Sequence, residues 1–120
     1  MRLITGGFSQ GKVRYAQKKY DISDSEIVDA AVASRQKMEE AELVYNLQEF
    51  IRENHNGCVC ELPAFREDAV IICDEVGCGV IPLSSEEREF REAVGRICCQ
   101  LAEQAESVEL VRCGIARRIK

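Results

Sequence analysis

The sequence predicts one α/β domain built on a mainly parallel β-sheet, and two features support this fold class. Residues 69–73 form a short, continuously apolar run, which is typical of a strand buried on both faces of a parallel sheet. Segments of strand character also alternate with segments of helical spacing, the order expected when helices connect parallel strands. The 120 residues suffice for one compact domain and are too few for two ordinary ones, so residues 1–120 are expected to form a single domain.

The first half of the chain is predicted to contain two short strands and two helices. Residues 2–5 are a strand that ends at a glycine pair, and residues 11–19 are a helix. Residues 27–28 suggest a second strand, and residues 34–54 are interpreted as one helix. The apolar positions that predict this second helix are Leu43, Leu47, Phe50 and Ile51.

The second half is predicted to contain a loop, the buried strand, a long helix and a terminal strand pair. The loop covers residues 58–68, and the helix begins after Ser84 or Ser85, either of which can cap it. Residues 108–111 form a strand, and residues 115–119 suit a returning strand that would complete a C-terminal antiparallel hairpin.

Composition and charge narrow the class of protein. The chain is 46% hydrophobic and 31% charged, as in a folded protein. Its net charge of −5 argues against a protein that binds nucleic acid mainly through charge. No apolar run approaches the roughly 20 residues that span a bilayer, and the first strand breaks at Gly6 too early for a signal peptide. We therefore expect a soluble cytoplasmic protein with no membrane span and no nucleic-acid partner.

Seven cysteines are present, an odd number, and we expect several of them, such as Cys73 and Cys98 in apolar runs, to pack as small apolar residues. They are Cys58, Cys60, Cys73, Cys78, Cys98, Cys99 and Cys113. The close pair Cys58 and Cys60 is not a Cys-x-x-Cys motif, and no second cluster completes four zinc ligands. No structural metal is therefore predicted.

A glycine loop is the first candidate site, and its pattern is Gly-x-x-x-x-Gly-Lys. It consists of Gly6, Gly7, Phe8, Ser9, Gln10, Gly11, Lys12 and Val13. Its glycines let backbone N–H groups converge on an anion, and the following helix N-terminus and Lys12 add positive charge. Val13 stands where a Ser or Thr hydroxyl would bind Mg²⁺, which weakens metal-supported phosphoryl transfer and leaves anion binding intact. The alternative is an ordinary glycine turn between strand and helix.

Two acids, Asp74 and Glu75, follow the buried strand and form the second candidate site. Ligands of open α/β sheets bind at the carboxyl ends of the strands, where Asp74 could hold Mg²⁺ directly or through water. The alternative is a solvated pair of acids, with Lys12 or Arg14 as partner. His55 is the only histidine, and its place beside a helix end favours a cap or surface role over catalysis.

From Asp74 onward the sequence resembles the bifunctional adenosylcobinamide kinase/adenosylcobinamide-phosphate guanylyltransferase family. The characteristic segment is Glu75-Val76-Gly77-Cys78-Gly79-Val80-Ile81-Pro82. Further matching positions are residues 88–92, 95–96, 100–102, 114–115 and 119–120, together with residues 4–7 and 11–12 at the start of the chain. About half of the chain carries the resemblance.

The resemblance implies a P-loop, three-layer fold related to the RecA-like nucleotide-binding proteins. Family members bind ATP or GTP, phosphorylate the aminopropanol hydroxyl of adenosylcobinamide, transfer GMP through a histidine, and assemble as oligomers. The cofactor expected for this chain is Mg²⁺ with ATP or GTP. This chain departs from the pattern at Gln10 and Val13, and it has no histidine in residues 34–45. We therefore expect a shortened relative that has lost guanylyl transfer.

Two main hypotheses of function follow. In the first, the chain is a cobinamide kinase-like enzyme in which Lys12 neutralises the transferred phosphate, Asp74 organises Mg²⁺, and Glu75 orients the substrate hydroxyl or accepts its proton. In the second, it is a non-catalytic protein that binds a nucleotide or a corrinoid. A third possibility is a structural subunit whose loop is a remnant. The expected partners are a nucleotide, cobinamide or another corrinoid, and further copies of the chain.

Overall fold

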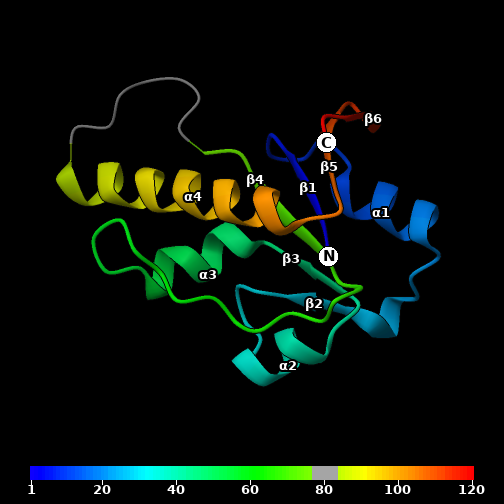
Figure 1. Ribbon diagram of the computed structural model, residues 1–120, viewed down its shortest axis with the longest axis horizontal. Coiled ribbons are helices and arrows are strands. Elements are labelled where there is room, and N and C mark those ends of the chain that lie inside the picture. Colours follow the sequence, from blue (N-terminus) through cyan, green and yellow to red (C-terminus); the bar gives the residue numbers. More distant parts are fainter. Residues whose placement is uncertain (77–83) are drawn as a thin grey trace.

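A six-stranded sheet forms the centre of the computed structural model, which describes residues 1–76 and 84–120 (Figure 1). The strands are β1 (Arg2–Gly6), β2 (Ile27–Asp29), β3 (Leu43–Tyr45), β4 (Val70–Asp74), β5 (Ser107–Arg112) and β6 (Ile115–Arg118). The helices are α1 (Lys12–Tyr20), α2 (Arg35–Glu40), α3 (Leu47–Asn54) and α4 (Ser85–Gln104), with a 3-10 turn at Asp24–Glu26. The strand order is β2-β3-β4-β1-β5-β6.

The pairing of the strands confirms the predicted sheet. All neighbours from β2 to β5 run parallel, and β6 returns antiparallel to β5 as the predicted C-terminal hairpin. The carboxyl ends of β1, β2, β3 and β4 therefore lie at the same edge of the sheet, where ligands of open α/β sheets bind.

Helices cover both faces of the sheet, which gives the three layers expected of the fold (Figure 1). Alternate residues of the central strands point to opposite faces because the side-chain period of a strand is two. Ile4 and Ile72 pack on the α1 side, whereas Leu3 and Ile71 pack on the side of α3 and α4. β4 is buried on both faces, as its unbroken apolar run predicts.

The single helix predicted over residues 34–54 is wrong. That segment contains α2, β3 and α3, because the chain becomes extended at Ala41 (ψ 146°) and Leu43 then pairs with β4. Leu43 belongs to the core on the α1 side, whereas Leu47 and Phe50 belong to the core on the opposite face. Apolar residues at helical spacing therefore serve two different faces of the sheet.

The long helix α4 begins where the sequence predicts. The Ser84 side chain accepts a hydrogen bond from the Glu87 N–H at 3.2 Å, so Ser84 is the cap. The glycine-rich part of the family segment, residues 77–82, lies outside the described residues. No helix in the described part of the chain is long and apolar enough to cross a membrane.

The cysteines divide between the core and the surface. Cys73 is fully buried in β4, and Cys98 of α4 packs against the same core, as expected for small apolar side chains. Cys99 and Cys113 are exposed, whereas Cys58 and Cys60 are half-buried. Cys78 lies outside the described residues.

Candidate functional site

Glycine is sterically required at the start of the glycine loop and conformationally favoured at its end. A Cβ atom on Gly6 would lie 2.4 Å from the backbone oxygen of Val111, and the φ of Gly6 is +152°. Gly11 adopts the left-handed conformation at φ +82° as it starts α1, and a Cβ there would lie 3.4 Å from Gly114. The loop therefore passes close to β5 and to the β5–β6 turn, and only glycine fits these two positions without strain.

Gln10 connects the loop to the β5–β6 turn through two hydrogen bonds. Its backbone oxygen accepts a hydrogen bond from the N–H of Gly114 at 2.8 Å. Its side-chain Oε1 accepts another from the N–H of Cys113 at 2.7 Å. Gln10 therefore has a structural role, which is to fix the loop against the end of the sheet.

Lys12 is almost fully buried beneath the loop. Its side chain is 5% exposed, and its Nζ lies 2.7 Å from Asp74 Oδ1 in an ion pair. The same ammonium group donates to the backbone oxygen of Gly7 at 2.6 Å. An ammonium has three N–H donors, so these two contacts leave one donor for a further acceptor. The structure thus brings together Lys12 of the first candidate site and Asp74 of the second.

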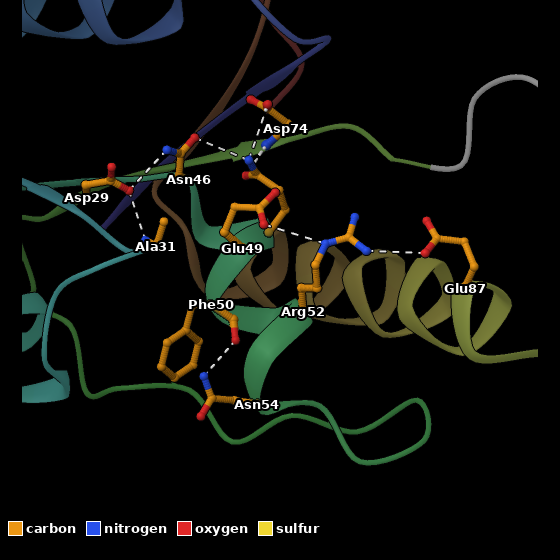
Figure 2. Close-up of polar contacts among 10 residues, drawn as sticks. Asp29, Ala31, Asn46, Glu49, Phe50, Arg52, Asn54, Asp74 and Glu87 are labelled. Atoms are coloured by element: carbon orange, nitrogen blue, oxygen red, sulfur yellow. Dashed lines mark hydrogen bonds and ion pairs between the residues drawn. The ribbon is translucent and has the colours of Figure 1, made fainter.

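A chain of polar side chains continues from Asp74 along the carboxyl edge of the sheet (Figure 2). Gln48 donates to Asp74 Oδ2 at 3.3 Å and accepts a hydrogen bond from the Asp74 N–H at 3.0 Å. Gln48 also donates to Asn46 Oδ1 at 3.3 Å, and Asn46 donates to Asp29 Oδ1 at 3.1 Å. The network therefore links the ends of β2, β3 and β4 to Lys12.

Two hollows border the glycine loop. The first, here called the strand-end hollow, has a volume of about 200 Å³ and is lined by the loop together with Asp74, Tyr45, Asn46 and Arg14. The second, the helix hollow, has a volume of about 600 Å³ and lies between α1 and the β5–β6 turn. A larger hollow of about 900 Å³ is lined by Met1, residues near Pro63 and the end of α4, and no loop residue lines it. We place the candidate site at the two loop hollows, because the charged side chains of Lys12, Arg14 and Asp74 line them.

The remaining sequence candidates take different places. Glu75 is exposed, donates its backbone N–H to the Gly6 oxygen at 2.9 Å, and does not line either loop hollow. His55 follows α3, where Nδ1 lies 2.8 Å from the Gly57 oxygen and the ring lies 6.0 Å from that of Phe90. These contacts agree with a structural role for His55.

Comparison with known proteins identifies the family. Residues 27–119 match the sequence model of the cobinamide kinase/cobinamide phosphate guanyltransferase family. The chain belongs to this family. It is also 45% identical over 51 residues to the bifunctional adenosylcobalamin biosynthesis protein CobU of Escherichia coli (strain K12). That alignment covers 42% of this chain and 28% of the relative.

The cobinamide kinase family match begins at β2, after the glycine loop. The role of the loop in this chain therefore depends on its own geometry: a sterically required Gly6, a left-handed Gly11, a buried lysine and an acid at the end of β4. Phe8 is 82% exposed at the rim of the strand-end hollow, and Ser9 has a positive φ of 55°.

Sequence reasoning missed Asp29, Tyr45, Asn46 and Gln48. Tyr45, Asn46 and Gln48 lie in or directly after β3, which was hidden inside the predicted helix, whereas Asp29 ends β2, one residue beyond the predicted strand. The available signal was Asn46, which adopts the left-handed conformation (φ 58°) between β3 and α3. Burial raises the pKa of the Tyr45 hydroxyl above its ordinary value, and the negative charge of Asp29 raises it further.

The residues around Lys12 do not fit a protein-held Mg²⁺ in this arrangement. Val13 brings no oxygen, and both carboxylate oxygens of Asp74 already have donors, Lys12 and Gln48. Among the described residues, no group of three or more histidine, cysteine or acidic side chains could hold a metal ion. Mg²⁺ at Asp74 would require Lys12 or Gln48 to release a carboxylate oxygen first, and the Mg²⁺ site stays a prediction.

Proposed function

We propose that this chain binds ATP or GTP through its glycine loop and acts in cobalamin biosynthesis as a cobinamide kinase-like protein. One observation carries the proposal: the buried Lys12 ammonium lies 2.7 Å from Asp74, under a loop that begins at Gly6, where a Cβ atom has no room, and ends at the left-handed Gly11. A buried lysine beside such a loop suits the terminal phosphates of a nucleotide. Membership of the cobinamide kinase family gives the pathway.

On binding, a phosphate of the nucleotide would take the place of Asp74 as the partner of the Lys12 ammonium group. A phosphate oxygen would accept the remaining N–H of Lys12 and then replace Asp74 as its principal anionic partner, because phosphate carries more charge than a carboxylate. Backbone N–H groups of the loop and the start of α1 would bind the other oxygens. Lys12 would thereby neutralise the negative charge that collects on the phosphoryl group.

Phosphoryl transfer to cobinamide would follow from this binding mode. The aminopropanol hydroxyl oxygen would attack the terminal phosphorus, the bond to the bridging oxygen would break, and the nucleoside diphosphate would leave. Asp74, released from Lys12, would accept the hydroxyl proton. Glu75 is the second acid available for that step, one residue further along and exposed.

A second candidate is a non-catalytic protein that binds a nucleotide or a corrinoid. Val13 and the saturated Asp74 carboxylate favour it, because both weaken Mg²⁺-supported transfer. The lack of a histidine in residues 34–45 supports loss of guanylyl transfer under either candidate.

Thermal unfolding with ATP, GTP or cobinamide tests binding first. A ligand at 100 times its dissociation constant should stabilise the fold by about 2.7 kcal/mol. Transfer of labelled phosphate to cobinamide, compared with Lys12→Ala, then separates the two candidates. Transfer that Lys12→Ala abolishes supports the kinase, and binding without transfer supports the second candidate. If neither nucleotide stabilises the protein, nucleotide binding is wrong.

Three further expectations belong to the same proposal. We propose that the chain works in the cytoplasm, forms a homo-oligomer and carries no structural metal. Exposed apolar side chains at Val32 and Ile115 support a contact between copies, since both are at least 75% exposed. Sedimentation of the purified protein would test the oligomeric state.

A further inference from the structure

We propose that Arg14 and Lys18 of α1 bind the nucleotide's phosphates in the helix hollow, so that nucleotide binding needs no metal ion. This inference deepens the proposed function and rests on it. It explains how the chain could neutralise a polyphosphate although Val13 offers no hydroxyl to Mg²⁺ and Asp74 is already paired.

The charges of α1 are unbalanced. The helix carries four cations, Lys12, Arg14, Lys18 and Lys19, and no acidic residue. Two of them are neutralised by carboxylates: Lys12 pairs with Asp74 at 2.7 Å, and Lys19 pairs with Glu109 at 3.0 Å. In the part of the chain that the structure describes, Arg14 and Lys18 have no ion pair or hydrogen bond through their side chains.

These two free cations lie on the same side of the helix and beside the loop. Residues four apart are neighbours on a helix surface, so Arg14 and Lys18 form one positive face. Both are exposed, and both line the helix hollow of about 600 Å³. Arg14 also lines the strand-end hollow, so it connects the space beside Lys12 to the space beside Lys18.

The helix hollow contains no opposing acid. Its other walls are residues 9–11 of the loop, Tyr15, and the turn at Cys113 and Gly114, none of which is acidic. In a protein with a net charge of −5, a cavity wall with two unpaired cations and no acid favours an anionic ligand. Arginine suits phosphate in particular, because its planar fork can donate two hydrogen bonds to one phosphate group.

The geometry favours a chain of phosphates over a single anion. Arg14 and Lys18 are four residues apart, about 6 Å along a helix at about 1.5 Å per residue. Lys12 points to another side of the helix, and Arg14, which lines both hollows, connects the two spaces. A nucleoside triphosphate with its terminal phosphate at Lys12 would therefore bring its remaining phosphates past Arg14 toward Lys18.

Calorimetric titration of the full chain with ATP and with GTP, once in EDTA and once in MgCl₂, tests the inference. We expect affinities in the two conditions to agree within a few-fold. Arg14→Gln and Lys18→Gln should each weaken binding in EDTA by about tenfold, the loss of one charge-assisted hydrogen bond. Lys37→Gln, which removes an exposed cation of α2 far from the loop, is the matched control and should bind like the unaltered chain.

The outcomes separate the inference from the proposed function. Binding that requires MgCl₂ would overturn metal-free recognition and leave nucleotide binding standing. Binding in EDTA that neither Arg14→Gln nor Lys18→Gln weakens beyond Lys37→Gln would overturn the role of the two cations. Absence of binding in both conditions would overturn the inference together with the proposed function. Thermal unfolding of each variant shows that it is folded.

Discussion

Gln48 of α3 forms hydrogen bonds with both the backbone and the side chain of Asp74 of β4. The Gln48 amide oxygen accepts the Asp74 N–H at 3.0 Å, and its amide nitrogen donates to Asp74 Oδ2 at 3.3 Å. Gln48 is 5% exposed, so both contacts are shielded from water. The carboxylate of Asp74 is therefore held from both sides, by Lys12 of α1 and by Gln48 of α3.

We expect Gln48→Leu to destabilise the protein by about 1–3 kcal/mol, the usual result of leaving buried polar groups without a partner. The Asp74 N–H and one carboxylate oxygen would each lose a hydrogen bond. Urea unfolding measures the change. Gln36→Leu, in which an exposed glutamine loses a 3.2 Å contact to Glu40, is the control. Equal stability of the two variants would show that the hydrogen bonds of Gln48 do not contribute to the free energy of unfolding.

Gly6→Ala is expected to destabilise the fold, whereas Gly95→Ala should stabilise it by about 1 kcal/mol. A Cβ on Gly6 would meet the Val111 oxygen at 2.4 Å and would force a residue at φ +152°. A Cβ on Gly95 meets nothing within 4 Å, and alanine favours the helix α4. Thermal unfolding of the two variants compares them directly. A tolerated Gly6→Ala would contradict the close passage of the loop against β5.

Glu109 makes stability depend on pH. It is 2% exposed on β5 and accepts hydrogen bonds from Tyr15, from Tyr20 at 2.5 Å and from Lys19 at 3.0 Å. Burial by itself would raise the pKa of Glu109, but these three donors outweigh it and lower the pKa below the ordinary value. The folded state therefore takes up this proton at a lower pH than the unfolded state, so the stabilisation is present above the ordinary glutamate pKa and is lost as the pH falls through the folded-state value.

Glu109→Gln should therefore cost about 1.5–3 kcal/mol at neutral pH, since an amide replaces a charged acceptor. It should also remove part of the loss of stability on acidification. Urea unfolding from pH 7 to pH 3 measures both effects, with the exposed Glu103→Gln as the control. If Glu109→Gln and Glu103→Gln showed the same pH profile as the unaltered chain, the buried carboxylate would have no part in acid unfolding.

The sequence was sufficient for the features set by local composition. The apolar run in β4, the glycine break after β1 and the periodicity of α4 led to the right sheet, loop and long helix. β3 could not be recognised, because Leu43 shares helical spacing with Leu47 and Phe50, and only tertiary pairing with β2 and β4 makes this segment a strand. The same holds for the candidate site. Lys12 and Asp74 could be predicted from local motifs, whereas Asn46 and Gln48 could not, because their positions depend on the missed strand.

Val13→Ser is expected to make nucleotide binding respond to Mg²⁺. The serine hydroxyl would supply the oxygen that valine lacks at the start of α1, so affinity in MgCl₂ should exceed affinity in EDTA by about tenfold, the effect of roughly one added charge-assisted contact. Val13→Ala loses the same apolar group without gaining a hydroxyl, and it should show no such difference. If the affinity of the unaltered chain rose with Mg²⁺ as much as that of Val13→Ser, the missing hydroxyl at Val13 would not be what limits the response to Mg²⁺.

The central claim is that the buried Lys12 ammonium binds a nucleotide's phosphate in place of Asp74. Calorimetric titration of ATP and GTP into the unaltered chain and into the double variant Lys12→Met, Asp74→Asn tests it most directly, because removing both charges avoids leaving Asp74 buried and unpaired. We predict saturable binding to the unaltered chain and at least a tenfold weaker affinity in the folded double variant. Equal affinities, or no binding to the unaltered chain, would contradict the account.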